Sequence, residues 1–392
     1  MMKKRELLKL GFGSRELAEL AAKAAAAADR ADEPKPVVRE KMKSLVAHPE
    51  SFFSDLHLGA LARAVASHRT KKSTTASAPL RTEKLEYRVW GRAGIEQATI
   101  DQMDNACRLP VVAAGALMPD AHVGYGLPIG GVLATRDCVI PYAVGVDIAC
   151  RMRMTLFDLP VSVIDGQRDR LRKALERETS FGVGATFHDR REHDVLDDDW
   201  SVSPITKHFK DKAWSQLGTS GSGNHFVEFG AIEVQQAVTA SGQSLAPGTY
   251  LALLSHSGSR GTGASVCSHY SKLAMQARPD LGKQLQHLAW LDLDTEAGHE
   301  YWSAMNLMGR YAAANHACIH RHIAKALGAE AVLAVENHHN FAWREQHGGE
   351  SLIVHRKGAT PAGAGVLGII PGSMASPAFL VRGKGGPESL DS

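Results

Sequence analysis

Residues 118–151 read MPDAHVGYGLPIGGVLATRDCVIPYAVGVDIACR, and the rest of the chain is organised around this stretch. Its apolar runs are rich in β-branched residues and are separated by Gly or Pro, which is typical of short strands joined by tight turns. Its last third places Asp147 and Cys150 three residues apart, directly after a VGV run. A carboxylate and a thiol at this spacing suggest one corner of a metal site.

Three further loops have the same pattern, in which a short apolar strand ends in Gly, Ser or Asn next to a His. They are GTSGSGNHFVE (218–228), SHSGSRGTG (255–263) and ENHHNFAW (336–343). Loops at strand ends on a rigid scaffold are places where ligand atoms can be positioned. The five candidate metal ligands are therefore Asp147, Cys150, His225, His256 and His339.

Imidazole and thiolate ligands suit zinc, manganese, iron or cobalt better than magnesium or calcium, which prefer oxygen. Because a thiolate can bridge two ions, the five ligands could hold one crowded centre or a pair. The alternative is that each His is structural and Cys150 is a small buried hydrophobe. A separate set on a predicted helix, His316, His320 and His322, is expected to form a helix face and not a ligand group.

Two of the loops, SGSGNH and SHSGSRGTG, also have the pattern of anion-binding loops, because successive backbone N–H groups of Gly and Ser form nests for phosphate. Arg260 could add a bidentate contact to such an anion. A plain Gly-rich turn is the alternative. In HRKGATPA (355–362), Arg356 and Lys357 either line a groove for a polyanion or are solvated charges.

The 392 residues carry a formal net charge of +3, which is too small to indicate nucleic-acid binding by itself. The five cysteines include no CxxC pair, which favours a reducing compartment. The N-terminus has no apolar run long enough for a signal peptide, and no segment is long enough to span a bilayer. We therefore expect a cytoplasmic protein without membrane association.

Residues 1–66 have helical spacing, and residues 67–84 are basic, polar and typical of a linker. From residue 85 to 392, strand patterns and helical patterns mix without a steady βαβ rhythm, which predicts an α+β domain and not a doubly wound sheet. The expected helices cover 163–178, 205–216, 264–277 and 296–327. The expected strands cover 86–91, 132–135, 138–146, 152–159, 226–234, 250–257, 331–337 and 351–357.

Seven motifs, in this order, resemble those of the RtcB-type RNA ligases: MPDAHVGYGLPIGGV, AVGVDIAC, GTSGSGNHFVE, SHSGSRG, HHN, HRKGAT and IPGSM. The resemblance covers about residues 87–392. It implies an RtcB-like mixed β-sheet core with surrounding helices, two Mn²⁺ ions, and GTP. It also implies an enzyme that joins RNA 3′-phosphate or 2′,3′-cyclic phosphate ends to 5′-hydroxyl ends, by way of a guanylate transferred from an enzyme His to the RNA 3′-phosphate.

The resemblance also implies roles for individual residues. Cys150 matches the ligand that bridges the two manganese ions, and Glu228 matches a residue that recognises guanine. Asp120 matches a position on the RNA side and is the candidate catalytic residue; Arg260 also matches such a position. The positions expected to contact the nucleotide are Asn224, His225, Phe226, Val227, Glu228, Arg260, His339, Asn340, Pro371, Gly372, Ser373 and Met374.

In this family, a segment like HGAGR holds the guanylate-accepting His and follows a stretch that matches VRGKGGPESLDS, where this chain ends at Ser392. We therefore expect the 392-residue chain to be unable to form the covalent guanylate. Two alternatives to ligation stay open. One is a remnant that binds metal and RNA without turnover, and the other is a metal-dependent phosphoesterase, in which a dinuclear centre activates water.

Overall fold

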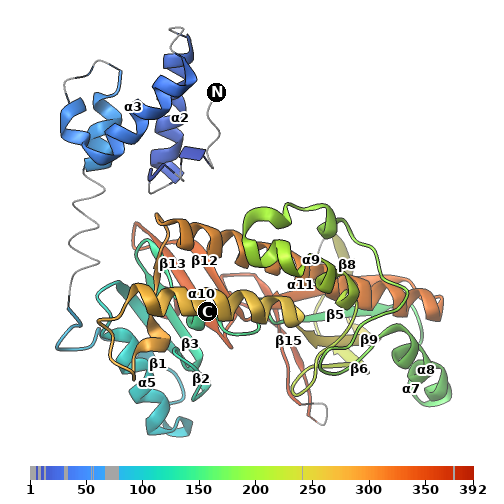
Figure 1. Cartoon of the computed structure of the whole chain (residues 1–392). Coiled ribbons are helices and arrows are strands. Elements are labelled where there is room, and N and C mark those ends of the chain that lie inside the picture. Colours follow the sequence, from blue (N-terminus) through green and yellow to red (C-terminus); the bar gives the residue numbers. More distant parts are fainter. Residues whose placement is uncertain are drawn as a thin grey trace.

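The structure, a computed structural model, describes residues 6–7, 10–12, 15–30, 34–53, 55, 57–66, 79–240, 242–373 and 376–392. Near the N-terminus, helices α2 (Arg15–Arg30) and α3 (Lys35–Ala47) and the 3-10 helix η1 (Pro49–Phe52) share a hydrophobic core of their own (Figure 1). The predicted helical content of this region is confirmed. Most of the predicted linker, 67–78, lies outside the described residues, and the domain boundary at residue 85 stays a prediction.

Two sheets form the body of the molecule. The first has the strand order β1-β2-β3-β13-β12, with β1 parallel to β2 and the other pairs antiparallel. The second is antiparallel throughout, with the order β11-β5-β9-β6. The strands are β1 (Arg88–Val89), β2 (Val112–His122), β3 (Ile129–Thr135), β12 (Asn340–His347), β13 (Glu350–Lys357), β5 (Arg151–Phe157), β6 (Phe226–Val234), β9 (Gly248–Ser257) and β11 (Ala331–His338).

Three two-stranded ribbons and seven further α-helices complete the body. The ribbons are β4 (Cys138–Val139) with β10 (Leu291–Asp292), β7 (Val238–Ala240) with β8 (Gln243–Leu245), and β14 (Leu367–Ile370) with β15 (Phe379–Arg382). The helices are α5 (Gln97–Cys107), α6 (Pro141–Val144), α7 (Val163–Gly166), α8 (Arg168–Glu178), α9 (Pro204–Gln216), α10 (Arg260–Ala277) and α11 (Glu296–Leu327). Short 3-10 helices are η2 (Arg92–Gly94), η3 (Asp194–Asp197), η4 (Trp200–Val202), η5 (Gln286–Leu288) and η6 (Pro387–Ser389).

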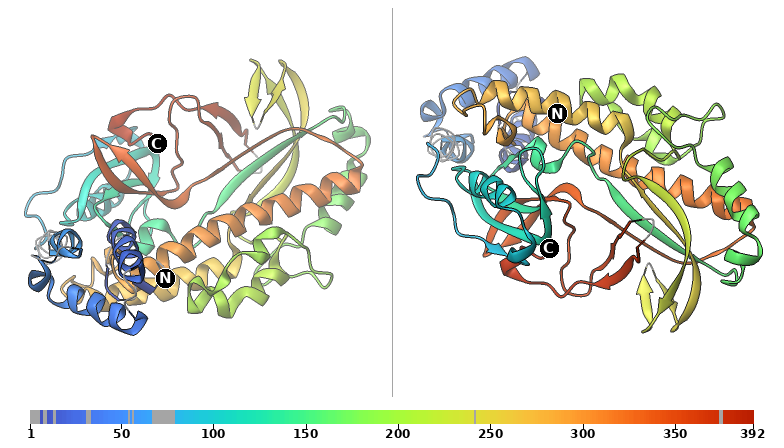
Figure 2. Two further views of the ribbon diagram at one scale, coloured as in Figure 1. Left: turned by 90° about the horizontal axis from the view of Figure 1, so that it is seen from above. Right: turned by 90° about the horizontal axis from the view of Figure 1, so that it is seen from below.

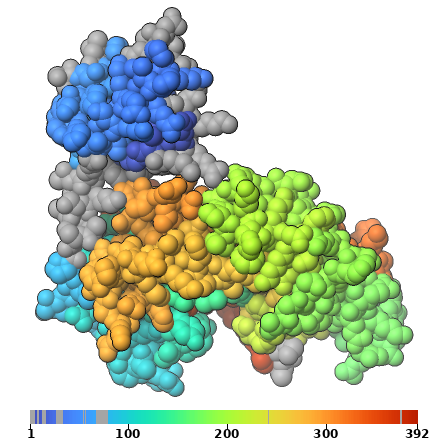
Figure 3. Space-filling model, in the orientation of Figure 1, coloured from blue at the N-terminus to red at the C-terminus, as the bar shows by residue number. Residues whose placement is uncertain are grey.

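The second sheet lies between helices on one face and the β7–β8 and β14–β15 ribbons on the other (Figure 2). The main core joins the first sheet to α5, α6, α10 and α11, and includes the fully buried Leu133, Tyr270 and Met305. One face of the second sheet packs on α8 and α11, and its other face packs on the β7–β8 and β14–β15 ribbons. Residues of α9 and α10 and the segment after α10 cover much of the face seen in Figure 3.

The α+β prediction is confirmed, while several predicted elements differ in extent. Residues 138–146 were expected to form one strand, but only Cys138–Val139 pairs in a ribbon. Pro141 begins α6 instead, because a proline lacks the N–H that a strand needs and has the φ angle of a first helical turn. The helix expected over 163–178 is two helices, which are separated at Gln167, where φ is −134°.

Strands β2 and β12 carried no clear sequence signal. The middle of β2 is rich in Ala and Gly, and β12 alternates polar and apolar residues within a loop motif. In the part of the chain that the structure describes, no helix combines the length and apolar character needed to cross a bilayer. All five cysteines are buried and free, as expected for reduced thiols.

Candidate metal centre

The loop between α6 and β5 carries the first two candidate ligands. Ala149 has a positive φ of 57°, and its N–H donates a 2.7 Å hydrogen bond to the backbone carbonyl of Asn340. The N–H of Cys150 donates to the carbonyl of Asp147 at 3.1 Å, which closes a tight turn. The turn brings the carboxylate and the thiol to the same side of the loop, as the three-residue spacing predicted.

The antiparallel second sheet brings the histidines to this loop. Cys150 directly precedes β5, while His256 lies near the end of β9 and pairs with both Met152 and Phe226. His225 directly precedes β6, and His339 directly follows β11. Because neighbouring strands run in opposite directions, the starts of β5 and β6 and the ends of β9 and β11 all lie at the same end of the sheet.

The five ligand atoms form a continuous row. Oδ2 of Asp147 lies 2.9 Å from Nε2 of His225, which lies 3.3 Å from Sγ of Cys150. On the other side, Sγ lies 3.1 Å from Nε2 of His256, which lies 3.2 Å from Nε2 of His339. The sulfur of Cys150 is therefore the middle of the row, with two ligand atoms on each side. Three of the five, Cys150, His225 and His256, meet the spacing of a metal-binding group.

Burial sets the protonation of these groups. It lowers the pKa of His256 to about 4 and that of His339 to about 3, with neighbouring imidazoles adding to the effect, so both rings are neutral at pH 7. Burial and the charge of Asp147 raise the pKa of the Cys150 thiol well above its ordinary value. Burial opposes ionisation of Asp147, but close contact with His225 outweighs it and holds the pKa of that carboxyl below its ordinary value.

A backbone carbonyl fixes the tautomer of His256. The carbonyl of Asn224 lies 2.8 Å from Nδ1 of His256 and can only accept a hydrogen bond, so Nδ1 carries the proton. Nε2 then presents a lone pair toward Cys150 and His339. This is the usual arrangement around a metal-bound imidazole, in which the second ring nitrogen donates to a carbonyl or carboxylate.

The surroundings of the cluster fit a bound cation. Oδ2 of Asp147 and Nδ1 of His225 are buried and have no hydrogen bond among the described residues. Two glycines leave the room that the ligands occupy: a Cβ built on Gly258 would lie 2.2 Å from Oδ1 of Asp147, and one on Gly221 would lie 2.0 Å from Nδ1 of His225. One carboxylate, one thiol and three imidazoles suit a transition-metal ion and not magnesium or calcium.

The predicted nucleotide contacts fall into two groups around β6. Asn224 is exposed, Phe226 and Val227 are buried, and Glu228 is half-buried with a pKa raised by burial. Across the same face, Ile369 of the β14–β15 ribbon shares a hydrophobic cluster with Phe226. The remaining predicted contacts of this ribbon are Pro371, Gly372 and Ser373 in the loop after β14, whereas Met374 lies outside the described residues.

Asn340 and Arg260 have structural partners. The side chain of Asn340 accepts a hydrogen bond from the N–H of Gly358 at 2.9 Å and donates to the carbonyl of Asp147 at 3.4 Å, so it holds the metal-ligand loop. Arg260 is buried at the start of α10 with a φ of 57°. Its Nε donates to Thr219 at 3.0 Å.

Asp120 lies near the end of β2, exposed to solvent. No hydrogen bond between described residues joins its side chain to the five ligands, and its catalytic role stays a prediction. The alternative of solvated charges is wrong for Arg356 and Lys357, because both side chains are buried, and the groove alternative stays a prediction. Arg356 makes a two-pronged ion pair with Glu345, at 2.7 and 2.9 Å, and Lys357 donates to two backbone carbonyls, those of Tyr125 and Tyr142.

A hydrogen-bonded chain behind His256 was missed by sequence reasoning. His316 and His320 lie on α11, as the helix-face prediction had it, and both side chains are buried. Nδ1 and Nε2 of these two rings lie 2.6 and 2.7 Å from the hydroxyl of Ser255, the neighbour of His256 on β9. The i, i+4 spacing of the two histidines in an apolar helix was the one available signal. His322, by contrast, is half-buried near Glu178.

The carbonyl of Ser257 determines which group donates and which accepts in each of these hydrogen bonds. Nε2 of His316 faces the carbonyl of Ser257 at 3.1 Å and must donate, so its Nδ1 accepts from Ser255. Ser255 then accepts from His320, whose Nδ1 accepts from the hydroxyl of Thr155 at 2.7 Å. Burial holds the pKa of both rings well below its ordinary value, so both are neutral. These hydrogen bonds fix β9 against α11 on either side of the candidate ligand His256.

Comparison with known proteins agrees with this geometry. The family model described as tRNA-splicing ligase RtcB matches residues 102–203 and 187–392, which include all five candidate ligands. RNA-splicing ligase RtcB of Escherichia coli (strain K12) is 31% identical over 346 residues, covering 79% of this chain and 80% of that protein. The relative of the same name in Mycobacterium tuberculosis is 32% identical over 348 residues, with 72% and 79% covered. The matches extend over both sheets and the candidate metal centre, and the chain therefore belongs to the RtcB family.

Proposed function

We propose that this protein is an RNA ligase that uses GTP and two Mn²⁺ ions. It joins RNA 3′-phosphate or 2′,3′-cyclic phosphate ends to 5′-hydroxyl ends, by way of a guanylated RNA 3′ end. The observation that carries the proposal is the row of five ligand atoms with the sulfur of Cys150 at its centre. The names of its relatives, RNA-splicing and tRNA-splicing ligases, support it.

The row divides naturally into two ion sites that share a thiolate. Asp147 and His225 would hold one ion with Cys150, and His256 and His339 would hold the other with the same thiolate. Divalent ions at such positions neutralise phosphate charge and orient an in-line displacement at phosphorus. The buried, neutral imidazoles of His256 and His339 keep their lone pairs available at pH 7.

The nucleotide is assigned to the face of β6 that carries Glu228. This carboxyl group has no hydrogen-bond partner among the described residues, and burial raises its pKa, so it gains from accepting the N–H groups of a guanine. The loop after β14, with Pro371, Gly372 and Ser373, is assigned to the same nucleotide. Asp120 and Arg260 are assigned to the RNA.

A ligation assay tests the proposal. The chain, extended by the segment that holds the guanylate-accepting His in this family, is incubated with Mn²⁺, GTP, a labelled RNA strand that ends in a 3′-phosphate, and an RNA strand that begins with a 5′-hydroxyl. Denaturing electrophoresis should show one joined product, which requires GTP and is lost in Cys150→Ala and His256→Ala. A matched pair of RNAs with 3′-hydroxyl and 5′-phosphate ends should give no product.

Two outcomes would contradict the proposal and identify the alternative. Release of phosphate from the RNA 3′ end without GTP and without joining would indicate a phosphoesterase. Binding of the RNA with no change in either strand would indicate a binding protein.

A further inference from the structure

The loop 180–185, SFGVGA, exposes two apolar side chains beside the metal centre. Phe181 is 47% exposed and Val183 is 93% exposed, which is the highest exposure among the large hydrophobic residues that the structure describes. Gly182 and Gly184 have positive φ angles of 105° and 75°, so the backbone between them turns in a way that lifts the two side chains outward. The ring of Phe181 contacts no other aromatic ring in the described part of the chain.

Hydrogen bonds hold this loop in a fixed position. The N–H of Gly182 donates to the carbonyl of Gly221 at 3.0 Å, and the N–H of Ser220 donates back to the carbonyl of Ser180 at 2.9 Å. Arg260 donates from Nη2 to the carbonyl of Gly182 at 3.1 Å. The start and the centre of the loop are therefore tied to the Gly-rich loop at 218–224 and to the start of α10.

The same contacts connect Phe181 to a metal ligand. Gly221, which accepts the hydrogen bond from Gly182, lies so close to His225 that a Cβ on it would meet Nδ1 at 2.0 Å and Nη1 of Arg260 at 2.9 Å. Gly182, the residue after Phe181, is therefore hydrogen-bonded to Gly221, which packs against His225.

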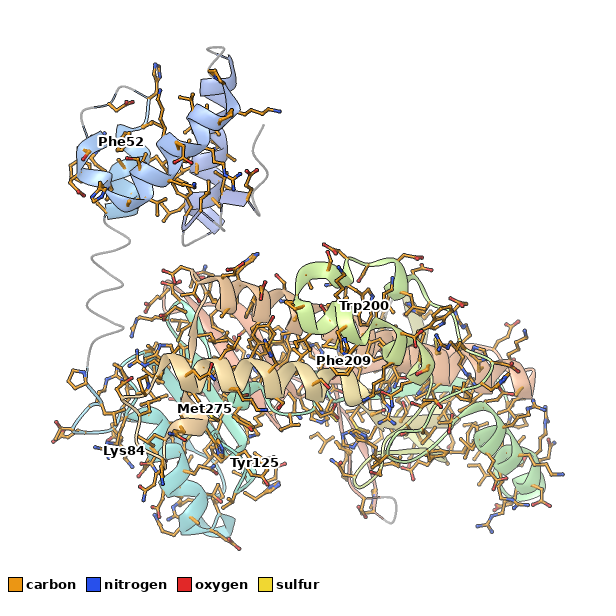
Figure 4. The ribbon with its side chains drawn as sticks, in the orientation of Figure 1. Phe52, Lys84, Tyr125, Trp200, Phe209 and Met275 are labelled. Carbon is orange, nitrogen blue, oxygen red and sulfur yellow. The ribbon has the colours of Figure 1, made fainter. Side chains whose placement is uncertain are left out.

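A lysine lies near the start of α10, where Arg260 contacts the loop 180–185. The ammonium of Lys212 on α9 would lie 3.0 Å from a Cβ built on Gly261, the residue after Arg260, and it forms no ion pair among the described residues. It also lies over the ring of Phe209, which Figure 4 labels on α9 beside the N-terminal part of α10. Gln216, one turn later on α9, donates to the carbonyl of Ala185 at 3.4 Å and so joins this helix to the loop.

We propose that Phe181 is a stacking platform for a nucleobase of the RNA strand whose end lies at the metal centre, with Lys212 contacting that strand's phosphates. This inference rests on the proposed function. An exposed aromatic ring beside a cation is the usual means of holding single-stranded RNA, because every base has a face to stack. Two apolar side chains are too little surface for a stable protein partner, which needs about 800 Å² on each side.

The base on Phe181 is distinct from the guanine of GTP. Glu228 and Phe226 are two residues apart on β6, and so they share the face that packs on the β14–β15 ribbon. The loop 180–185 is instead tied to the loop 218–224, α9 and α10. The two proposed nucleotide positions therefore lie against different elements.

Equilibrium binding tests the inference without any ligation step. Fluorescence anisotropy of a labelled single-stranded RNA with a 3′-phosphate is measured with the full chain in Mn²⁺ and without GTP. Phe181→Ala should raise the Kd on the order of 5- to 100-fold, the size of one lost base–aromatic stack. Phe181→Trp should restore binding, and Lys212→Ala should lower the slope of log Kd against log salt by about 0.7.

The matched control is Phe53→Ala, which removes a ring that is 40% exposed in the N-terminal region and should leave RNA binding unchanged. The melting temperatures of all variants should equal that of the wild type. The inference is wrong if the wild type does not bind the RNA, if Phe181→Ala binds it as tightly as the wild type, or if the variant loses GTP affinity to the same extent. A protein that binds RNA through Phe181 but joins no ends would contradict the proposed function alone.

Discussion

Gly258 packs against Asp147 so closely that a Cβ atom on Gly258 would stand 2.2 Å from Oδ1 and 2.3 Å from Oδ2 of the carboxylate. The N–H of the next residue, Ser259, donates to the same Oδ1 at 3.2 Å, and the hydroxyl of Ser259 donates to the carbonyl of Ile148 at 2.6 Å. The loop that follows β9 therefore shapes the position of a ligand that lies more than a hundred residues earlier in the chain.

Gly258→Ala should displace the Asp147 carboxylate, because a methyl group cannot share its space. We expect manganese affinity, measured by isothermal titration calorimetry, to fall by about 10-fold or more, which is the effect usually seen when the support of a metal ligand is disturbed. Gly282→Ala is the matched control, since a Cβ at Gly282 meets no atom within 4 Å. Equal affinities for the two variants would show that the carboxylate is not held as described.

Manganese should raise the melting temperature of the protein, whereas magnesium should not. The ligand atoms are nitrogen and sulfur for four of the five residues, and magnesium binds such ligands poorly. A ligand at about 100 times its Kd stabilises the folded state by about 2.7 kcal/mol. Differential scanning fluorimetry with each metal, with a chelator, and with the Cys150→Ala variant gives the comparison. An equal shift with both metals would argue against the thiolate and imidazole ligands.

His355 should make the protein less stable in mild acid. It is fully buried, accepts the N–H of Ile140 at 2.9 Å and lies 3.0 Å from the carbonyl of Leu133. Burial lowers its pKa from 6.5 to about 4. Between these values the unfolded chain binds a proton that the folded chain does not, so the free energy of unfolding falls as the pH falls below about 6.5.

Between pH 7.5 and pH 5.5, His355 alone should lower the free energy of unfolding by about 1.3 kcal/mol. Urea unfolding at the two pH values gives the change in the free energy of unfolding. In His355→Gln this change should be smaller than in the wild type by about 1.3 kcal/mol. His188→Gln, on an exposed loop, should leave the difference unchanged. If the wild type and His355→Gln depended on pH equally, His355 would not be neutral in the folded protein.

Ser255→Ala should destabilise the fold while leaving all five ligands in place. Its hydroxyl bridges His316 and His320, and the substitution leaves two buried ring nitrogens without a partner. The expected loss in the free energy of unfolding is about 1–3 kcal/mol. Ser351→Ala, at an exposed position of β13, should change the stability little. A loss for Ser255→Ala no larger than for Ser351→Ala would mean that the chain of hydrogen bonds is not formed.

Sequence reasoning predicted the elements whose signal is local. The strand at Phe226–Val234 and the helix at Glu296–Leu327 were predicted with their observed bounds, because each has an unbroken apolar pattern between turn residues. β2 was missed because its middle residues are small, and its pairing with β3 depends on neighbours that the local sequence does not reveal. The strand predicted through Pro141 was wrong because the ring of proline ends the ladder.

The candidate ligands could be named from the sequence, but the residues that support them could not. The spacing of Asp147 and Cys150 and the repeated strand-end histidines were visible in the chain. The carbonyl of Asn224 that orients His256, and the glycines at 221 and 258 that leave room for the ligands, depend on backbone atoms brought together by the sheet. The burial of Arg356 and Lys357 was missed for the same reason, since only the tertiary structure shows that Glu345 and two carbonyls take up their charges.

The manganese content of Cys150→Ala tests the central claim most directly. The sulfur stands between Asp147 with His225 on one side and His256 with His339 on the other, so its removal would take a ligand from both proposed ions at once. After equilibrium dialysis, atomic absorption should find two manganese ions per chain in the wild type and in Cys267→Ala, a buried cysteine on α10, and fewer than one in Cys150→Ala. Two ions retained by Cys150→Ala, or none bound by the wild type, would contradict the account of a two-metal centre bridged by this residue.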